Sequence, residues 1–260
     1  MADRRLVTSP HRLSFGLALA LAACATPLPD GAVCRSLDGR ALFPPELPDA
    51  TRAEQERLLA EARARLAADP DDRDAAIWVG RRLGYLGRYR DAIATFTQAL
   101  ERHPNDPFLL RHRGHRHISV REFGFAIDDL TAAARACRTT PDEIEPDGLP
   151  VPGRPPHATL HFNVYYHLGL ALFLAGDFWG AEHAWLHCLA VCRNDESRVA
   201  VCHWLWSVRM RLGDPAGAMA AVAAITPDLD VVENTSYHSL CLYYAGRLSR
   251  DAIEVPGGSA

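Results

Sequence analysis

The feature that most constrains this chain is a set of small and apolar residues that recurs 34 residues later. Gly80, Ala92, Phe96 and Ala99 reappear as Gly114, Ala126, Leu130 and Ala133. Self-similarity at a fixed period of about 20 to 50 residues is typical of solenoids. Small residues at these spacings let two helices approach within about 8 to 10 Å. The pattern predicts an all-α chain of antiparallel helix pairs that holds other molecules.

Composition is consistent with a folded helical domain. The chain has 260 residues, of which 48% are hydrophobic, enough for a sizeable core. Its formal net charge is −4. Because nucleic-acid binding depends on a strongly basic surface, we expect no nucleic-acid partner.

The first 24 residues have the order of charge and hydrophobicity of a secretion signal. Arg4, Arg5 and Arg12 begin it, residues 13–21 are apolar, and Leu-Ala-Ala-Cys ends it at Cys24. The apolar run is shorter than the roughly 20 residues that span a bilayer. Small residues directly before a cysteine resemble the bacterial lipoprotein signal. The resemblance implies removal of residues 1–23 and lipidation of Cys24. An ordinary secretory signal with a chance cysteine is the alternative.

A lipidated Cys24 would place the protein in the cell envelope. Two or three acyl chains anchor a protein stably where one does not. Ala25 follows the cysteine, where inner-membrane lipoproteins often carry Asp. We therefore expect a lipid-anchored protein at the outer membrane, facing the periplasm.

Three further segments follow from local composition. Residues 24–50 are rich in proline and have neither a helical nor a strand period, so they are predicted to form a flexible tether. Thr51 and Glu54 have the spacing of a capping box, which predicts that the helical domain, residues 51–255, starts there. Residues 256–260 are predicted to be a disordered tail.

The repeated residues match the tetratricopeptide (TPR) pattern. With Arg73 as position 1, the residues at positions 8, 20, 24, 27 and 32 are Gly80, Ala92, Phe96, Ala99 and Pro104. A second pair starts at Pro107, and a third, from Phe162, has Gly169, Ala181, Trp185 and Cys188. The chain resembles the TPR family over residues 73–250, which implies a right-handed superhelix of helix hairpins, an α-solenoid. Weaker matches after residue 195, including Trp206 at position 8, leave the number of C-terminal repeats open.

The TPR resemblance also implies a concave groove lined by the first helix of each pair, which binds a protein or peptide partner. The groove-facing positions carry Arg81, Tyr85, Arg111, His115, Asn163, Tyr166 and His203. Arginine offers a planar fork of donors that suits carboxylates and peptide carbonyls. The alternative is that these residues form ordinary solvated helix faces.

Residues 111–117 are unusually rich in arginine and histidine. They point all round a helix, so the simpler interpretation divides them between groove and surface. The alternative is an anion-selecting patch whose charge rises on acidification, because histidine titrates near about pH 6.5.

A proline-rich and acidic insertion, residues 139–159, separates the second and third pairs. Structureless loops of this length inside compact folds tend to be functional or disordered. One hypothesis is that the insertion folds over the groove with its acidic side chains opposite the basic helix.

Histidine and cysteine residues raise the question of a metal site or a disulfide. His183 and His187 share a helix face, but no Cys-x-x-Cys pair supports a structural zinc site. Cys188 occupies position 27, where a small residue packs between helices, so we expect no metal or cofactor. Cys192 and Cys202 flank a turn and form the candidate disulfide.

The sequence contains no recognisable catalytic motif, so we do not expect an enzyme. The interpretation we favour is a membrane-anchored periplasmic adaptor that binds a protein partner. The alternative is a periplasmic protein that binds a small ligand or metal through its histidine-rich helices.

Overall fold

The computed structural model describes residues 27–149 and 151–253. The predicted signal, Cys24 and the predicted tail lie outside them. The described helices are α1 Asp49–Ala68, α2 Arg73–Tyr85, α3 Tyr89–Arg102, α4 Pro107–Ser119, α5 Phe123–Ala136, α6 Leu160–Ala175, α7 Phe178–Val191, α8 Asp195–Leu212, α9 Pro215–Val222 and α10 Thr235–Tyr244. Two short strands, β1 Cys34–Arg35 and β2 Ala41–Leu42, precede them, and a 3-10 turn, Arg250–Ala252, follows. Within these ranges no helix has the length and hydropathy to cross a bilayer.

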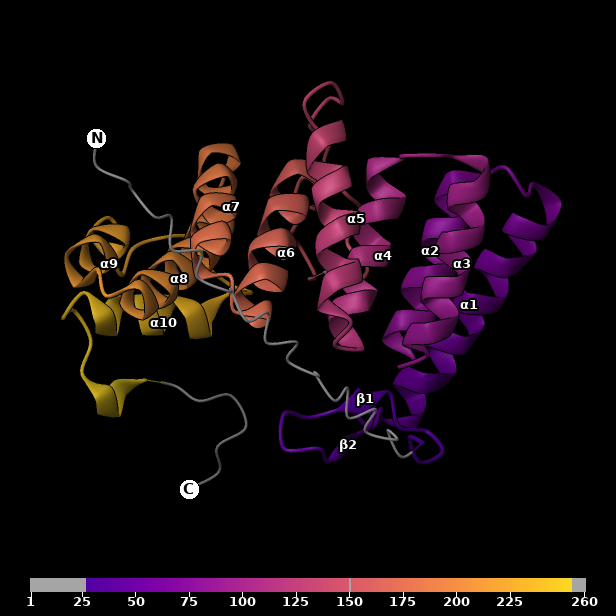
Figure 1. Ribbon diagram of the computed structural model, residues 1–260, viewed down its shortest axis with the longest axis horizontal. Coiled ribbons are helices and arrows are strands. Elements are labelled where there is room, and N and C mark those ends of the chain that lie inside the picture. The colour runs from indigo at the N-terminus through magenta and orange to yellow at the C-terminus, as the bar shows by residue number, and fades with distance from the viewer. Residues whose placement is uncertain (1–26, 150, 254–260) are drawn as a thin grey trace, which may run out of the picture.

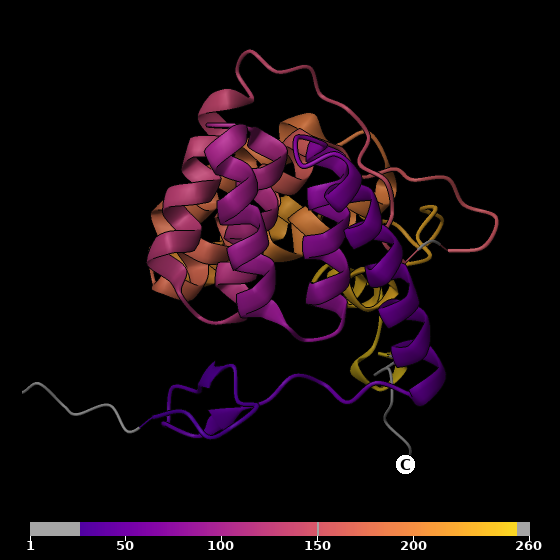
Figure 2. The same cartoon turned by 90° about the vertical axis from the view of Figure 1, so that its right-hand side faces the viewer.

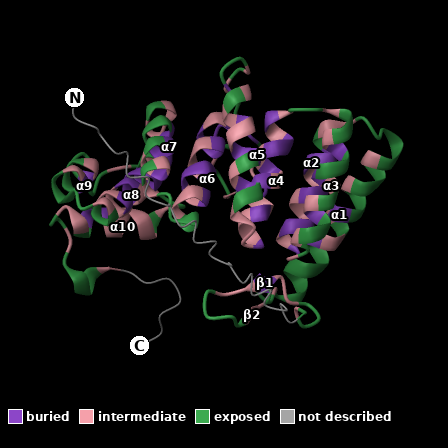
Figure 3. Ribbon diagram, viewed as in Figure 1, coloured by how far each residue is buried: buried purple, intermediate pink, exposed green. Residues whose placement is uncertain are grey.

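The helices stack in chain order into a curved row of antiparallel pairs (Figure 1). Helix α2 contacts α4, α4 contacts α6, and α6 contacts α8, whereas α3, α5 and α7 make no comparable contacts with one another. The first helices of the pairs therefore lie on the inside of the curve, and we call the surface formed by α2, α4, α6 and α8 the inner face. Buried residues concentrate between neighbouring helices (Figure 3). The predicted all-α solenoid is confirmed.

Glycine at position 8 makes room for the large residue at position 24. A Cβ atom added to Gly80 would overlap the Phe96 ring, and one added to Gly169 would overlap the Trp185 indole. At Gly114 the added atom would lie 2.8 Å from Leu130 Cγ. In each pair the nearest neighbour of the glycine at position 8 is the side chain at position 24, which fills the space that glycine leaves. At Gly114 the backbone oxygen of Ala126, at position 20, would also lie 3.3 Å from the added atom.

Replacing Gly80 with alanine is expected to destabilise the fold by about 1 to 3 kcal/mol, because the new methyl group overpacks against Phe96. Adding Phe96→Leu, which copies the second repeat, should recover part of this loss. Gly124→Ala is the matched control: Gly124 is exposed on α5 with open space around it, so its substitution should be neutral or slightly stabilising. Urea unfolding measures all three. Equal losses at Gly80 and Gly124 would rule out the packing account.

Aspartate–proline pairs start two of the helices. Asp106 accepts a hydrogen bond from Leu109 N, with Pro107 in the first turn of α4. Asp214 does the same for Gly217 N at the start of α9. The aspartate side chain accepts a hydrogen bond from a free backbone N–H in the first turn of the helix. Proline suits the first helical position because it has no N–H that needs an acceptor.

The predicted capping box at the first helix is wrong. Helix α1 begins at Asp49, with Pro48 as its N-cap and no side-chain cap. Thr51 and Glu54 therefore lie inside the helix, and Glu54 pairs with Arg57 at 2.7 Å instead. An acidic residue, Asp49, in the first turn favours the earlier start through the helix dipole.

The described part of the predicted tether, residues 27–50, is more ordered than its composition indicated. Strands β1 and β2 pair antiparallel, with Cys34 opposite Leu42, and Cys34 is buried. Pro44 packs against Gly87 in the α2–α3 turn, where a side chain on Gly87 would collide with it. This contact fixes the segment beside the helices instead of leaving it as a free coil.

Candidate functional site

The α5–α6 loop, residues 137–159, crosses the inner face. Figure 2 shows most of the loop lying along the side of the helical stack and not between the helices. It folds back on itself through an antiparallel bridge between Ile144 and Thr159, with Glu145 N donating to Ala158 O at 2.9 Å. Thr159 also caps α6 by accepting from Phe162 N. The loop is thus fixed at the start of α6.

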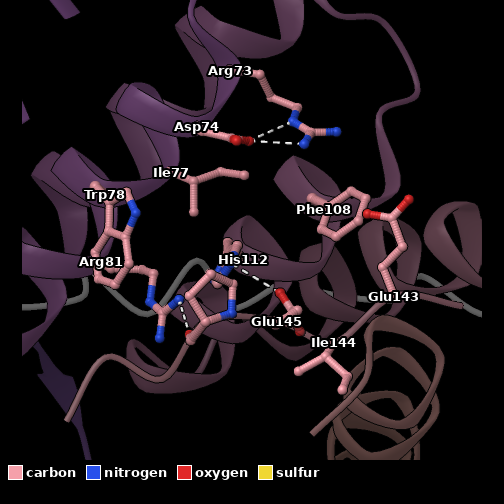
Figure 4. A pocket seen from close by; sticks show the side chains of 11 residues that line it. Arg73, Asp74, Ile77, Trp78, Arg81, Phe108, His112, Glu143, Ile144 and Glu145 are labelled. Carbon is pink, nitrogen blue, oxygen red and sulfur yellow. Dashed lines mark hydrogen bonds and ion pairs between the residues drawn. The ribbon is translucent and has the colours of Figure 1, made fainter. Parts of the chain in front are cut away.

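Glu145 is the buried anchor of this loop and is only 4% exposed. Its carboxylate lies 3.3 Å from Arg111 Nε and 3.2 Å from His112 Nε2, and it accepts a hydrogen bond from Asn163 Nδ2. Figure 4 shows Glu145 facing His112 across the site. Burial alone would raise the pKa of Glu145, but Arg111, His112 and Asn163 together hold it well below its usual range. The hypothesis that an acid of the insertion opposes the basic helix is confirmed at this residue.

Helix α2 holds the same loop by its backbone. Arg81 Nη1 donates to Pro146 O at 2.7 Å, and Arg82 Nη1 donates to Gly148 O at 3.2 Å. Gly148 lies so close to the Tyr85 hydroxyl that any side chain there would overlap it. The inner face therefore grips an extended segment through one carboxylate and two peptide carbonyls.

The structure brings some of the predicted groove residues together and separates others. Arg81, Tyr85, Arg111 and Asn163 meet at the loop, and His115 lies nearby on α4, against His167. Tyr166 and His203 instead belong to an aromatic cluster. Tyr166 accepts from Trp204 Nε1 at 3.0 Å, and the His203 ring stacks on Tyr237 at 4.6 Å between centroids. The seven residues thus form two neighbouring sets.

The predicted groove-facing residues omit three that matter here, namely His112, Arg116 and Glu145. A signal existed for Arg116, since it repeats Arg82 at the same 34-residue offset as the core residues. No such signal existed for Glu145, which is one of several acids in the insertion. Only the path of the loop shows which acid reaches Arg111.

The alternative interpretation of residues 111–117, a patch that gains charge on mild acidification, is wrong for two of its histidines. Burial, followed by the charge of Arg111, lowers the pKa of His112 to about 3. Burial and Arg116 lower the pKa of His115 well below its ordinary value. Both rings stay neutral near pH 6, so the positive charge at this site comes from arginine.

The metal and disulfide candidates find no support in the described residues. His183 and His187 are exposed on α7, with their rings edge-to-face at 4.7 Å. No group of three or more His, Cys, Asp or Glu side chains there could hold a metal ion. The six cysteines of these ranges are free thiols, so the Cys192–Cys202 disulfide is not formed. Cys192 Sγ donates instead to Cys188 O at 3.3 Å.

Comparison with known proteins identifies the fold. No known family profile matches the chain. A thermophilic TPR protein from Thermus thermophilus superposes with a TM-score of 0.51 at 17% identity, covering 76% of this chain and 92% of that one. MamA from Desulfovibrio magneticus gives 0.50 at 18% identity, covering 66% and 84%. At such identities the likeness concerns the fold alone. Together with the helix pairs and their glycine contacts, it shows that the chain has the tetratricopeptide-repeat solenoid fold.

Proposed function

We propose that this protein is an adaptor without catalytic activity, which holds an extended acidic segment of a protein partner on its inner face. The observation that carries the proposal is how this face holds the α5–α6 loop. Arg81 and Arg82 donate hydrogen bonds to peptide carbonyls of the loop. Arg111 forms an ion pair with a carboxylate of the loop, and Asn163 donates a hydrogen bond to the same carboxylate. Carbonyls are common to every extended peptide, and a carboxylate adds selectivity for acidic ones. A partner segment of this kind would exchange with the loop.

The aromatic cluster beside the loop supplies further surface for the same partner. Tyr166, Trp204 and Tyr237 are each partly exposed and lie on α6, α8 and α10. Tyrosine and tryptophan are enriched among the few interface residues that contribute most of the binding free energy. A partner segment that starts at the loop and continues toward α10 would cover them.

The cellular location is part of the proposal. Its support is the order of charge, apolar run and Leu-Ala-Ala-Cys at the N-terminus, which favours a lipid anchor on Cys24 in the outer membrane, facing the periplasm. The partner would then be another envelope protein. The adaptor would keep it near the membrane surface.

Site-specific photo-crosslinking in intact envelopes tests the binding face. A photoreactive phenylalanine analogue at Tyr85 or Tyr237 is expected to give a discrete crosslinked product in the membrane fraction. The matched control is the same analogue at Gln98, which is exposed on α3, away from the inner face. Equal products from Gln98 and from the two inner positions would argue against the groove. Absence of any product from Tyr85 and Tyr237 would argue against the adaptor.

A further inference from the structure

A small cavity between α2 and α4 is lined mainly by cationic side chains. Its volume is about 110 Å³, and its polar lining consists of Arg81, Tyr85, Arg111, His112, His115 and Arg116. Gly80 and Phe96 close its apolar side. Three guanidinium groups from two helices thus converge on a space large enough for a small group.

The partners of Arg81 and Arg111 leave donors unused. Arg81 donates to Pro146 O and to the Tyr85 hydroxyl. The Arg111 Nε atom is buried and has no hydrogen-bond partner, although it lies 3.3 Å from a Glu145 oxygen. A buried guanidinium N–H without an acceptor costs free energy. An acceptor placed in the cavity would remove that cost.

Among the three arginines of the cavity, Arg116 has the most hydrogen-bond donors without an acceptor in the described part of the chain. Within the described residues its side chain makes no hydrogen bond and no ion pair, and its guanidinium lies 5.6 Å from the centre of the Tyr89 ring. Burial, followed by the charge of Arg111, lowers the pKa of Arg116 to about 10. The groups that act to raise this pKa are tyrosines and not carboxylates. Arg116 is therefore a cation held in place without an anion.

The charges around the cavity do not balance. Arg81, Arg111 and Arg116 contribute three positive charges, and among the described acids only Glu145 pairs with any of them. His112 and His115 stay neutral because their pKa values are lowered. Two positive charges remain in a partly desolvated space, where like charges repel strongly.

We propose that this cavity binds a phosphoryl group, either as inorganic phosphate or as a phosphomonoester. A phosphoryl group carries about 1.5 to 2 negative charges near pH 7 and at least three strong acceptor oxygens, which suit the two surplus charges and the three guanidinium groups. A carboxylate has one charge and two oxygens, which a single arginine fork satisfies. This site does not depend on the protein partner proposed above.

The test is phosphate binding to the full chain, measured by isothermal titration calorimetry and thermal melting at pH 7.5, with ionic strength held constant by chloride. Inorganic phosphate should bind and raise the melting temperature of the wild type by mass action. Arg116→Gln should bind phosphate roughly ten- to a hundredfold more weakly. Arg116→Lys, which keeps the charge but loses the planar fork, should fall between them.

Arg63→Gln is the matched control, because it removes the same charge from an exposed position on α1. It should bind phosphate like the wild type. The melting temperature of Arg116→Gln in chloride alone should equal or exceed that of the wild type, since a repulsive charge has been removed. Loss of phosphate binding in a variant that is otherwise unharmed cannot come from misfolding.

Two further titrations define the ligand. Acetate should bind at least tenfold more weakly than phosphate, and equal affinity would overturn the phosphoryl assignment. Glycerol 3-phosphate tests the source: tighter binding than phosphate indicates an esterified group, and weaker binding indicates the free ion. No phosphate binding by the wild type, or identical binding by Arg63→Gln and Arg116→Gln, would overturn the site itself.

Discussion

Lowering the pH from 7.5 to 5.5 is expected to destabilise the fold by about 5 kcal/mol through four histidines. Burial, followed by the charge of Arg111, lowers the pKa of His112 and His167 to about 3, and burial lowers that of His203 to about 4. Burial and Arg116 lower the pKa of His115 well below its ordinary value. In the unfolded chain each titrates near about 6.5. Because the unfolded state then binds more protons, each histidine costs about 1.4 kcal/mol at pH 5.5.

The loss of stability should begin as the pH falls through about 6.5 and level off only near the folded-state pKa values. A change of about 1 kcal/mol moves the melting temperature of a domain of this size by roughly 2 to 4 °C. The melting temperature should therefore fall by roughly 10 to 20 °C between the two pH values. Thermal unfolding followed by circular dichroism measures it.

Two variants separate this effect from general acid sensitivity. His203→Gln should remove about a quarter of the pH dependence, judged from the difference between its own two melting temperatures. His183→Gln, at an exposed position on α7, should retain the wild-type dependence. If His203→Gln and the wild type respond alike to pH, His203 does not stay neutral in the fold.

The first two repeats could be predicted almost to the residue because their signals are local. Helices α2 and α4 begin at Arg73 and Pro107, the positions that the TPR alignment gives. Small residues at fixed spacings and aspartate–proline caps act within one helix pair. Neither signal needs knowledge of the rest of the chain.

Features that depend on distant contacts could not be predicted. The β1–β2 hairpin has two residues per strand, too few for a visible alternation, and its segment is fixed by packing of Pro44 on Gly87. The neutral state of His112 likewise depends on burial beneath a loop that starts some 25 residues later. Composition indicated that an acidic insertion lies near a basic helix, but it did not indicate that Glu145 is the acid that reaches Arg111.

Removing the Glu145 carboxylate is expected to destabilise the fold by about 3 to 5 kcal/mol. Glu145→Ala would leave Arg111 buried with its charge uncompensated, close to the charges of Arg81 and Arg116. The α5–α6 loop should also detach from α4, because Asn163 and His112 lose their acceptor. Urea unfolding measures the first effect, and the rate of proteolytic cleavage within the loop measures the second.

A double variant distinguishes the cost of an unpaired buried charge from the net contribution of the ion pair to the free energy of unfolding. Replacing both partners by apolar residues, Arg111→Met with Glu145→Leu, should restore most of the lost stability, since no buried charge then remains unpaired. Glu143→Ala is the control within the loop, because Glu143 is exposed and only its backbone carbonyl anchors α6. That variant should be within about 0.5 kcal/mol of the wild type. A Glu145→Ala variant as stable as Glu143→Ala would mean that the loop does not hold Arg111 in solution, and the inner face would then lie open to a partner.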